Sequence, residues 1–381
     1  MSYNKVLYLD NVSSTKTDSE ILNTYTHICK KYFANSSANH RLGREVWRLE
    51  QQAKTQILDL LKVSNYNLIF TSGATEANNM AIKSVALANM HRGKHIITSE
   101  IEHPSVYESF EFLKKYLGFE VTYIKVDKSG LIDLESLEDS VCDETILVSI
   151  MSVNNEIGVI NNPSDWIKVV KNKSKAICHV DMVQAIGKID LDFDGVDLAS
   201  FSAHKINGVN GSGFLLARKH LDLVPLISGG PQQDKLRAGT PNSPANIVLA
   251  KTVRLTLENM LKNNEKLKIL NDYLYSELSK IPEISLNSDQ INSVYNIINF
   301  SVSNVGSEIM MNALSEANIF VSAGSTCHQD LYEDSHVLTA INKDSLSQKG
   351  RIRISLDSSL DISDLEYFIK KIKEIINNYG I

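Results

Sequence analysis

Cysteine is scarce in this sequence. Four of the 381 residues are cysteine, and they are widely spaced: Cys29, Cys142, Cys178 and Cys327. None belongs to a CxxC pair, and the chain lacks the dense cysteine spacing of a disulfide framework. This pattern excludes a zinc ribbon and a small disulfide-stapled fold. We therefore expect reduced thiols and no metal site.

Long apolar runs and an excess of basic residues are also missing. No apolar stretch approaches the ~18 residues that span a bilayer, and residues 1–10 do not read as a signal or transit peptide. Lys and Arg total 39 against 45 Asp and Glu, a formal net charge of −6. Because the lysines are dispersed among acids, no basic stripe for nucleic acid is present. We expect a cytoplasmic protein that binds neither nucleic acid nor membrane.

Proline and glycine are infrequent, at 7 and 18 residues, and no repeat of fixed period is present. With 43% hydrophobic and 22% charged residues, this composition excludes a disordered chain, a collagen and a solenoid. At roughly 150 residues per domain, the length fits two or three domains with a sizeable core.

Short apolar runs alternate with helical periodicity over much of the chain. Buried strands are predicted at 67–71, 95–99, 121–125, 146–151, 176–181, 196–200 and 213–217. Helices are predicted between several of these strands, at 76–90, 105–117 and 163–173. This alternation favours a mostly parallel sheet with helices on both faces. The last two strands, which a glycine-rich turn joins, are open to a different pairing.

The pattern changes after Pro244. A long amphipathic helix is predicted from there towards Lys262, followed by a further helix from Leu267, strands at 294–301 and 351–356 and a closing helix at 363–378. We therefore predict an α/β protein with a large domain, residues 16–260. A smaller α+β domain would combine residues 1–15 and 261–381.

Residues 71–79, TSGATEANN, end one predicted strand and begin a helix. Hydroxyl groups and free N–H groups at the positive end of a helix dipole suit a phosphate. An ordinary Ser or Thr N-cap would give the same pattern. No Walker A and no GxGxxG motif follows any strand, which weighs against a nucleotide.

Two other strands end in residues with catalytic potential. Asp181 lies where ligands bind in parallel sheets, and its carboxylate could pair with a protonated pyridine nitrogen or merely cap a helix. Lys205 comes just past a strand and could form a Schiff base, although most lysines are surface charges. Together with a phosphate cup, these two residues form the combination that pyridoxal phosphate (PLP) chemistry requires.

The chain resembles the cysteine desulfurases, the NifS-like branch of the class V aminotransferases with the fold-type I PLP architecture. The most similar stretches are 70–79, 101–103, 154–158, 179–184, 202–205, 237–242, 324–327 and 352–356. The resemblance implies a large domain with a mostly parallel seven-stranded sheet and a smaller domain that carries the Cys327 loop. It implies a homodimer that converts L-cysteine to L-alanine. The sulfur would pass to Cys327 as a persulfide and then to an acceptor protein, as in iron–sulfur cluster assembly.

The resemblance also implies roles for individual residues. Lys205 would hold PLP and move the Cα proton, Cys327 would be the nucleophile, and His103 would stack on the ring. PLP would also contact Thr75, Asp181, Gln184, Ser202, His204 and, from the partner subunit, Thr240. The substrate carboxylate would bind Asn155 and Arg353.

Three segments depart from the family pattern: 12–16, 231–236 and 328–334. Two alternatives therefore stay open. One is a selenocysteine lyase or another class V lyase that uses the same lysine and aspartate. The other is a diverged paralogue that carries sulfur or binds a partner but turns over weakly.

Overall fold

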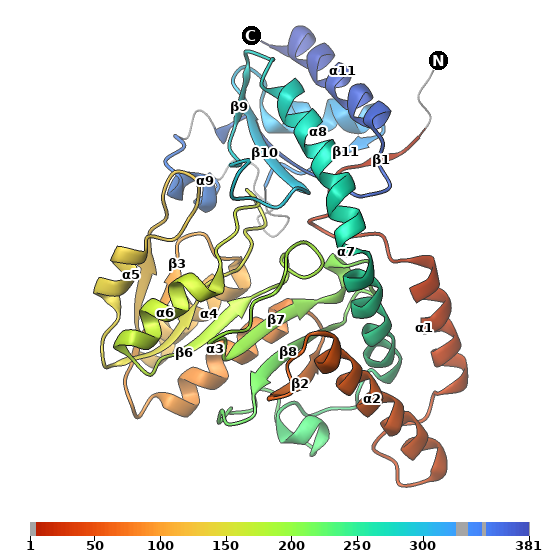
Figure 1. Ribbon diagram of the computed structural model, residues 1–381, viewed down its shortest axis with the longest axis vertical. Helices are drawn as coiled ribbons and strands as arrows, with labels where there is room; N and C mark the ends of the chain where they lie inside the picture. The colour runs from red at the N-terminus through yellow and green to blue at the C-terminus, as the bar shows by residue number, and fades with distance from the viewer. Residues whose placement is uncertain (1–4, 325–333, 345–347, 381) are drawn as a thin grey trace.

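The computed structural model describes residues 5–324, 334–344 and 348–380. Cys327 and residues 328–333 of the third departing segment lie outside the described residues. Figure 1 shows a broad sheet flanked by helices and, at one end of the molecule, a smaller group of strands and helices near the C-terminus.

The central sheet has seven strands in the order β2-β8-β7-β6-β5-β3-β4. Their bounds are β2 (Tyr66–Thr71), β3 (His95–Ser99), β4 (Glu120–Ile124), β5 (Thr145–Ser149), β6 (Ile177–Asp181), β7 (Leu198–Ser202) and β8 (Gly213–Arg218). Only β8 runs antiparallel to its neighbours. The predicted mostly parallel α/β sheet is confirmed. The connection from β7 to β8 is too short for the crossover that a parallel pair requires, and the strand therefore reverses.

Helices cover both faces of this sheet, and the side chains of each strand alternate between the faces. The helices of the first half are α1 (Ser19–Lys31), α2 (Arg41–Leu60), α3 (Ala74–Asn89), α4 (Pro104–Leu117), α5 (Leu134–Ser140) and α6 (Pro163–Lys173). Leu68 of β2 faces the apolar cluster that contains residues of α2 and α6. Ile69 faces the cluster with α3 and α4. The continuous apolar runs in the sequence follow from this burial on both sides.

The smaller group has its own apolar cluster, which includes Leu7, Phe300 and Phe368. In it, β10 (Ile297–Val302) lies between β9 (Ile284–Leu286) and β12 (Arg351–Ser355), antiparallel to both. The other described elements of this group are β1 (Leu7–Tyr8), α8 (Ser307–Glu316), β11 (Ile319–Phe320) and α11 (Ile362–Tyr379). The short helix α9 (His336–Ala340) instead packs Val337 and Leu338 into the apolar cluster of the central sheet. Because β1 pairs with β11, the N-terminal segment lies beside the C-terminal part of the chain.

One helix, α7 (Ser243–Leu278), connects the two groups (Figure 1). The sequence predicted two helices with a break after Lys262, and this prediction is wrong. No proline or glycine occurs between residues 262 and 267 to stop the helix, and it continues for 36 residues, about 54 Å at 1.5 Å per residue. Our division of the chain at residue 260 falls inside α7 and remains a proposal.

Across the described ranges, no helix combines the length and the apolar character needed to cross a membrane.

Candidate functional site

A cavity of about 460 Å³ opens where β2, β6 and β7 end at the same edge of the sheet. It brings together most of the predicted site residues: Thr75, His103, Asn155, Asp181, Gln184, Ser202, His204, Lys205 and Arg353. Thr240 does not line this cavity, and Cys327 lies outside the described residues. Side chains from distant parts of the sequence therefore converge on one hollow.

One end of the cavity has the form of an anion cradle. Ser202 is 2% exposed, and its Oγ has no hydrogen-bond partner among the residues described. A Cβ on Gly73, whose φ is +152°, would lie 3.6 Å from this oxygen. Directly after Gly73, the N-terminus of α3 presents free backbone N–H groups. A free hydroxyl beside a helix N-terminus fits a phosphate group.

Glycine is required at a second position of this cradle. A Cβ on Gly213 would lie only 2.7 Å from Gly73 Cα and 2.5 Å from Phe201 O. A side chain at Gly213 would therefore push the turn after β2 away from the end of β7.

Lys205 ends a short 3₁₀ turn, Ala203–Lys205, that follows β7. Its Nζ donates hydrogen bonds to the carbonyl oxygens of Val12 at 2.5 Å and Ser13 at 2.8 Å. Both contacts belong to the departing segment 12–16, and both use backbone atoms. Substitutions in that segment therefore leave the acceptors of the lysine in place.

Asp181 is the last residue of β6 and is 5% exposed. Its carboxylate accepts hydrogen bonds from Asn78 Nδ2 at 2.7 Å and from the Val183 N–H at 3.0 Å. Burial raises the pKa of Asp181, whereas these hydrogen bonds and the charge of Lys205 act to lower it. A buried carboxylate in this setting fits a cationic ring nitrogen.

A chain of hydrogen bonds joins Asp181 to His103. Asn78 Nδ2 also donates to Ser105 Oγ at 2.9 Å, and Ser105 Oγ lies 2.8 Å from His103 Nδ1. His103 Nδ1 accepts from the Ser105 N–H at 3.1 Å, so the neutral imidazole carries its proton on Nε2. Asn78 and Ser105 lie in or next to segments that the sequence singled out, but their linking role was not predicted.

His204 stands beside Lys205 at the mouth of the cradle. Burial, reinforced by the charges of Lys205 and His103, lowers the pKa of His204 to about 4. The ring is therefore neutral at pH 7 and can donate a hydrogen bond without a net charge.

Arg353 of β12 also lines the cavity and is 1% exposed. Its guanidinium donates to Asp10 Oδ1 at 2.9 Å, Ser13 Oγ at 2.8 Å and the Asn155 carbonyl oxygen at 3.1 Å. Its Nε has no partner within the described ranges. A buried guanidinium with an unmatched N–H fits a carboxylate ligand.

The second departing segment, 231–236, is attached to the edge of the central sheet. The Gln233 amide donates to Phe70 O at 2.6 Å and accepts from the Phe70 N–H at 2.9 Å, as a neighbouring strand would. Gln233, Asp234 and Lys235 all have left-handed φ values, 48°, 59° and 65°. This segment protects the edge strand β2 and leads to Thr240, which is exposed.

Glu102, next to His103, is fully buried. Its Oε1 accepts from Ser99 Oγ at 2.5 Å and from the Met151 N–H at 3.0 Å, and its Oε2 has no partner in the described structure. Burial raises the pKa of Glu102 to about 8, and the charge of Asp181 acts in the same direction. Glu102 is therefore protonated at neutral pH. No sequence pattern predicted this protonation.

We expect Glu102 to make stability fall as pH rises. The native carboxyl keeps its proton up to about pH 8, whereas the unfolded one loses it near its ordinary value of 4.5. Its contribution is thus fully present below pH 4.5 and is lost towards pH 8. Between pH 5 and pH 7, the fall in the free energy of unfolding should be about 2 kcal/mol smaller in Glu102→Gln than in the wild type. Denaturant unfolding at both pH values tests this, with the exposed Glu108→Gln as control. Equal pH slopes for the wild type and Glu102→Gln would refute it.

The chain shares its sequence and fold with known proteins. Residues 7–368 match the family model described as aminotransferase class-V. A protein named cysteine desulfurase IscS from Dictyoglomus turgidum is 40% identical over 373 residues, covering 97% of this chain and 94% of the relative. One of the same name from Methanosarcina thermophila is 36% identical over 375 residues, with coverages of 98% and 92%. A solved structure named NifS-like protein has a TM-score of 0.92 at 35% identity, with coverages of 98% and 100%.

Proposed function

The chain belongs to the class V aminotransferases and, within them, to the PLP-dependent cysteine desulfurases, and from this we propose how its residues divide the reaction. The observation that supports the assignment best is the single cavity that joins Lys205, Asp181 and the partnerless hydroxyl of Ser202. These groups match the aldehyde, the ring nitrogen and the phosphate of PLP. When bound, PLP withdraws electrons from the Cα of an attached amino acid.

Around PLP, each residue of the cavity has its own task. Lys205 holds the cofactor covalently and moves the proton at Cα. Asp181 keeps the ring nitrogen protonated, Gln184 donates to the ring oxygen, and His103 covers the ring face. Thr75, Ser202 and His204 bind the phosphate at the N-terminus of α3.

The substrate is oriented by its carboxylate. Arg353 offers its unmatched Nε–H to that group, and Asn155 lies beside it in the cavity lining. The thiolate of Cys327 accepts the sulfur of L-cysteine and leaves L-alanine. The outer sulfur atom of the persulfide then passes to an acceptor protein in the cytoplasm, and we propose iron–sulfur cluster assembly as its use.

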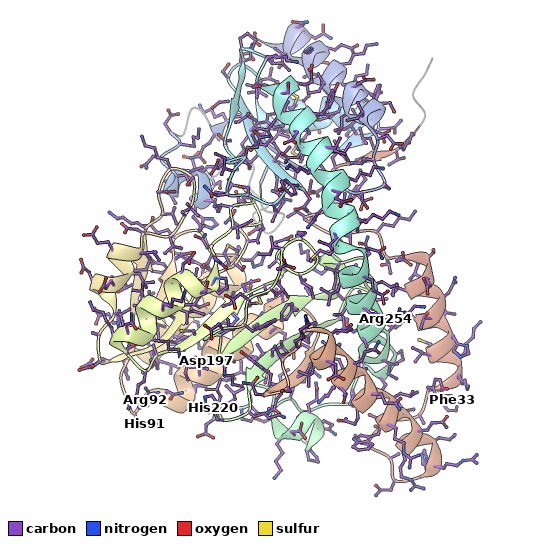
Figure 2. The ribbon with its side chains drawn as sticks, viewed as in Figure 1. Phe33, His91, Arg92, Asp197, His220 and Arg254 are labelled. Atoms are coloured by element: carbon purple, nitrogen blue, oxygen red, sulfur yellow. The ribbon has the colours of Figure 1, made fainter. Side chains whose placement is uncertain are left out.

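A homodimer would complete the site, because Thr240 is exposed and is not among the residues that line the cavity of its own chain. Exposed apolar side chains near α1 and α2 supply a surface for this contact, among them Phe33 at 76% and Trp47 at 52% exposure. Figure 2 shows Phe33 at the outer edge of the molecule, just past α1. Trp47 also lines a hollow together with Pro231 and Pro241, so this surface continues to the segment that carries Thr240.

Asp181→Asn is expected to lower kcat by about 10²- to 10³-fold, because a neutral amide no longer stabilises the protonated ring on which electron withdrawal depends. The amide keeps the shape of the side chain, so the fold should be retained. Alanine formation under saturating L-cysteine measures the effect. The exposed Asp222→Asn serves as the control, and wild-type activity in Asp181→Asn would contradict the assignment.

Alanine release from L-cysteine and from L-selenocysteine, with a thiol reductant present, tests the substrate. We expect one sulfide for each alanine and a higher kcat/KM for L-cysteine. A preference for selenocysteine would indicate the lyase alternative. Negligible turnover of both would favour the sulfur-carrier paralogue.

A further inference from the structure

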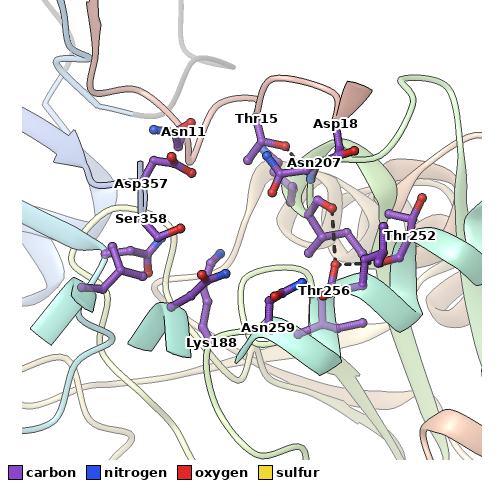
Figure 3. A pocket seen from close by; sticks show the side chains of 18 of the residues that line it. Asn11, Thr15, Asp18, Lys188, Asn207, Thr252, Thr256, Asn259, Asp357 and Ser358 are labelled. Atoms are coloured by element: carbon purple, nitrogen blue, oxygen red, sulfur yellow. Dashed lines mark hydrogen bonds between the residues drawn. The ribbon is translucent and has the colours of Figure 1, made fainter. Parts of the chain in front are cut away.

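A second cavity, of about 320 Å³, shares Lys205 with the first as a lining residue. Figure 3 shows it with Asp357 and Ser358 on one side, Thr252 and Thr256 on the other, and Lys188 between them. The proposed reaction assigns no role to this cavity or to Lys188, which lines it.

The backbone holds Lys188 firmly in the turn after β6. Gly187 has a φ of +77°, and a Cβ there would lie 2.3 Å from Thr256 Cγ2, so only glycine lets the turn pack this closely on α7. Asn264 Nδ2 of α7 donates to the Lys188 carbonyl oxygen at 2.8 Å. The backbone of Lys188 is therefore fixed relative to α7.

The amine of Lys188 is directed at a residue of the PLP site. Its Nζ donates to Gln184 Oε1 at 2.5 Å, and none of the ion pairs found within the described ranges includes Lys188. Burial and the charge of Lys205 lower the pKa of Lys188 to about 7. The acceptor of this half-buried amine is thus an amide and not a carboxylate.

This contact determines how the Gln184 amide is turned. A lysine ammonium offers only donors, so the protonated Lys188 requires the amide oxygen of Gln184 on its side, which is the arrangement in the structure. The amide NH₂ then lies on the other side, where Nε2 donates weakly to the Val12 carbonyl oxygen at 3.4 Å. Gln184 is buried and lines the PLP cavity, so its second N–H is available there.

We propose that Lys188 is a positioning residue that orients Gln184, so that the amide NH₂ and not the amide oxygen meets the anionic ring oxygen of PLP. The inference rests on the proposed contact of Gln184 with that oxygen. In the reverse orientation two oxygens would face each other, and the ring oxygen would lose a charge-assisted hydrogen bond.

The visible absorption maximum of bound PLP in the purified holoenzyme tests this. Lys188→Met and Gln184→Ala should shift the band in the same direction. Lys188→Met should also lower kcat about tenfold, the size expected when a hydrogen bond to a charged group is lost, with little change in KM. Lys188→Arg, which keeps the donors, should restore the band. In the double variant, Lys188→Met should add nothing to the shift of Gln184→Ala.

Two further variants keep the test decisive. Asn259→Ala changes the same cavity, but among the described residues its side chain donates only to the Leu255 carbonyl oxygen. The absorption band and kcat should therefore stay unchanged. Gln184→Glu keeps an acceptor for Lys188 but removes the NH₂ donor, and it should shift the band even if Lys188→Met does not fold.

Three outcomes would overturn the inference. A Lys188→Met shift that persists in the Gln184→Ala background would mean that Lys188 acts directly through its charge. If the band shifts in Gln184→Ala but not in Lys188→Met, Lys188 does not orient Gln184. An unchanged band in both Gln184 variants would refute the proposed hydrogen bond between Gln184 and PLP. In each of these cases the wild type would still produce alanine. Failure of this inference can therefore be told apart from failure of the proposed function, in which the wild type would produce none.

Discussion

Replacing Lys205 by alanine is expected to abolish turnover, with a fall in kcat of about 10⁴-fold or more. The amine would supply both the covalent link to PLP and the group that moves the Cα proton, and its carbonyl acceptors at Val12 and Ser13 cannot take over either task. The variant should also lose its PLP on gel filtration, because only non-covalent contacts remain.

Borohydride reduction of the wild-type holoenzyme, followed by peptide mapping, identifies the lysine that carries PLP. We expect the adduct on Lys205 alone. Lys173→Ala, an exposed lysine whose Nζ donates to the Glu138 carbonyl oxygen, should keep full activity and serves as control. An adduct on another lysine would reject the assignment.

Cys327→Ser is expected to eliminate sulfide release, a loss of about 10³-fold or more, while PLP and L-cysteine still bind. A serine hydroxyl is a far poorer nucleophile toward sulfur than a thiolate. Described residues on both sides of the Cys327 segment contact residues in or next to the cavity lining. The Ser322 N–H donates to the Arg353 carbonyl oxygen at 3.1 Å, and Ser335 Oγ donates to Glu156 Oε2 at 2.6 Å.

Absorbance and product analysis separate the two steps. In Cys327→Ser, addition of L-cysteine should still change the visible band of bound PLP, with no sulfide above background. The exposed Cys142→Ser should behave like the wild type. Loss of PLP from Cys327→Ser would instead assign this cysteine a structural role.

Much of the fold could be predicted because the sheet imposes its own pattern. Burial on both faces produces continuous apolar runs, and turn residues separate them from helical segments. The continuity of α7 could not be predicted. Its exposed middle is polar, and the apolar pattern changes there from one cluster to the other. The helix continues because nothing in residues 262–267 stops it and both ends are packed.

The site could be predicted where reactive side chains follow the ends of strands, as Asp181 and Lys205 do. It was not predictable where the backbone or a tertiary contact acts. Every residue has a carbonyl oxygen, so the identity of Val12 does not show that this atom binds Lys205. The contact between Ser105 and Asn78 depends on how α3 packs on α4. Lys188 was missed for a related reason, because a lone lysine after a strand resembles a surface charge.

The central claim is that sulfur moves from L-cysteine to Cys327, and mass spectrometry after one turnover without reductant tests it most directly. The account predicts one alanine per protomer and the mass of one extra sulfur atom on the peptide that contains Cys327. Alanine without that added sulfur, or added sulfur on Cys29 or Cys142 instead, would contradict it.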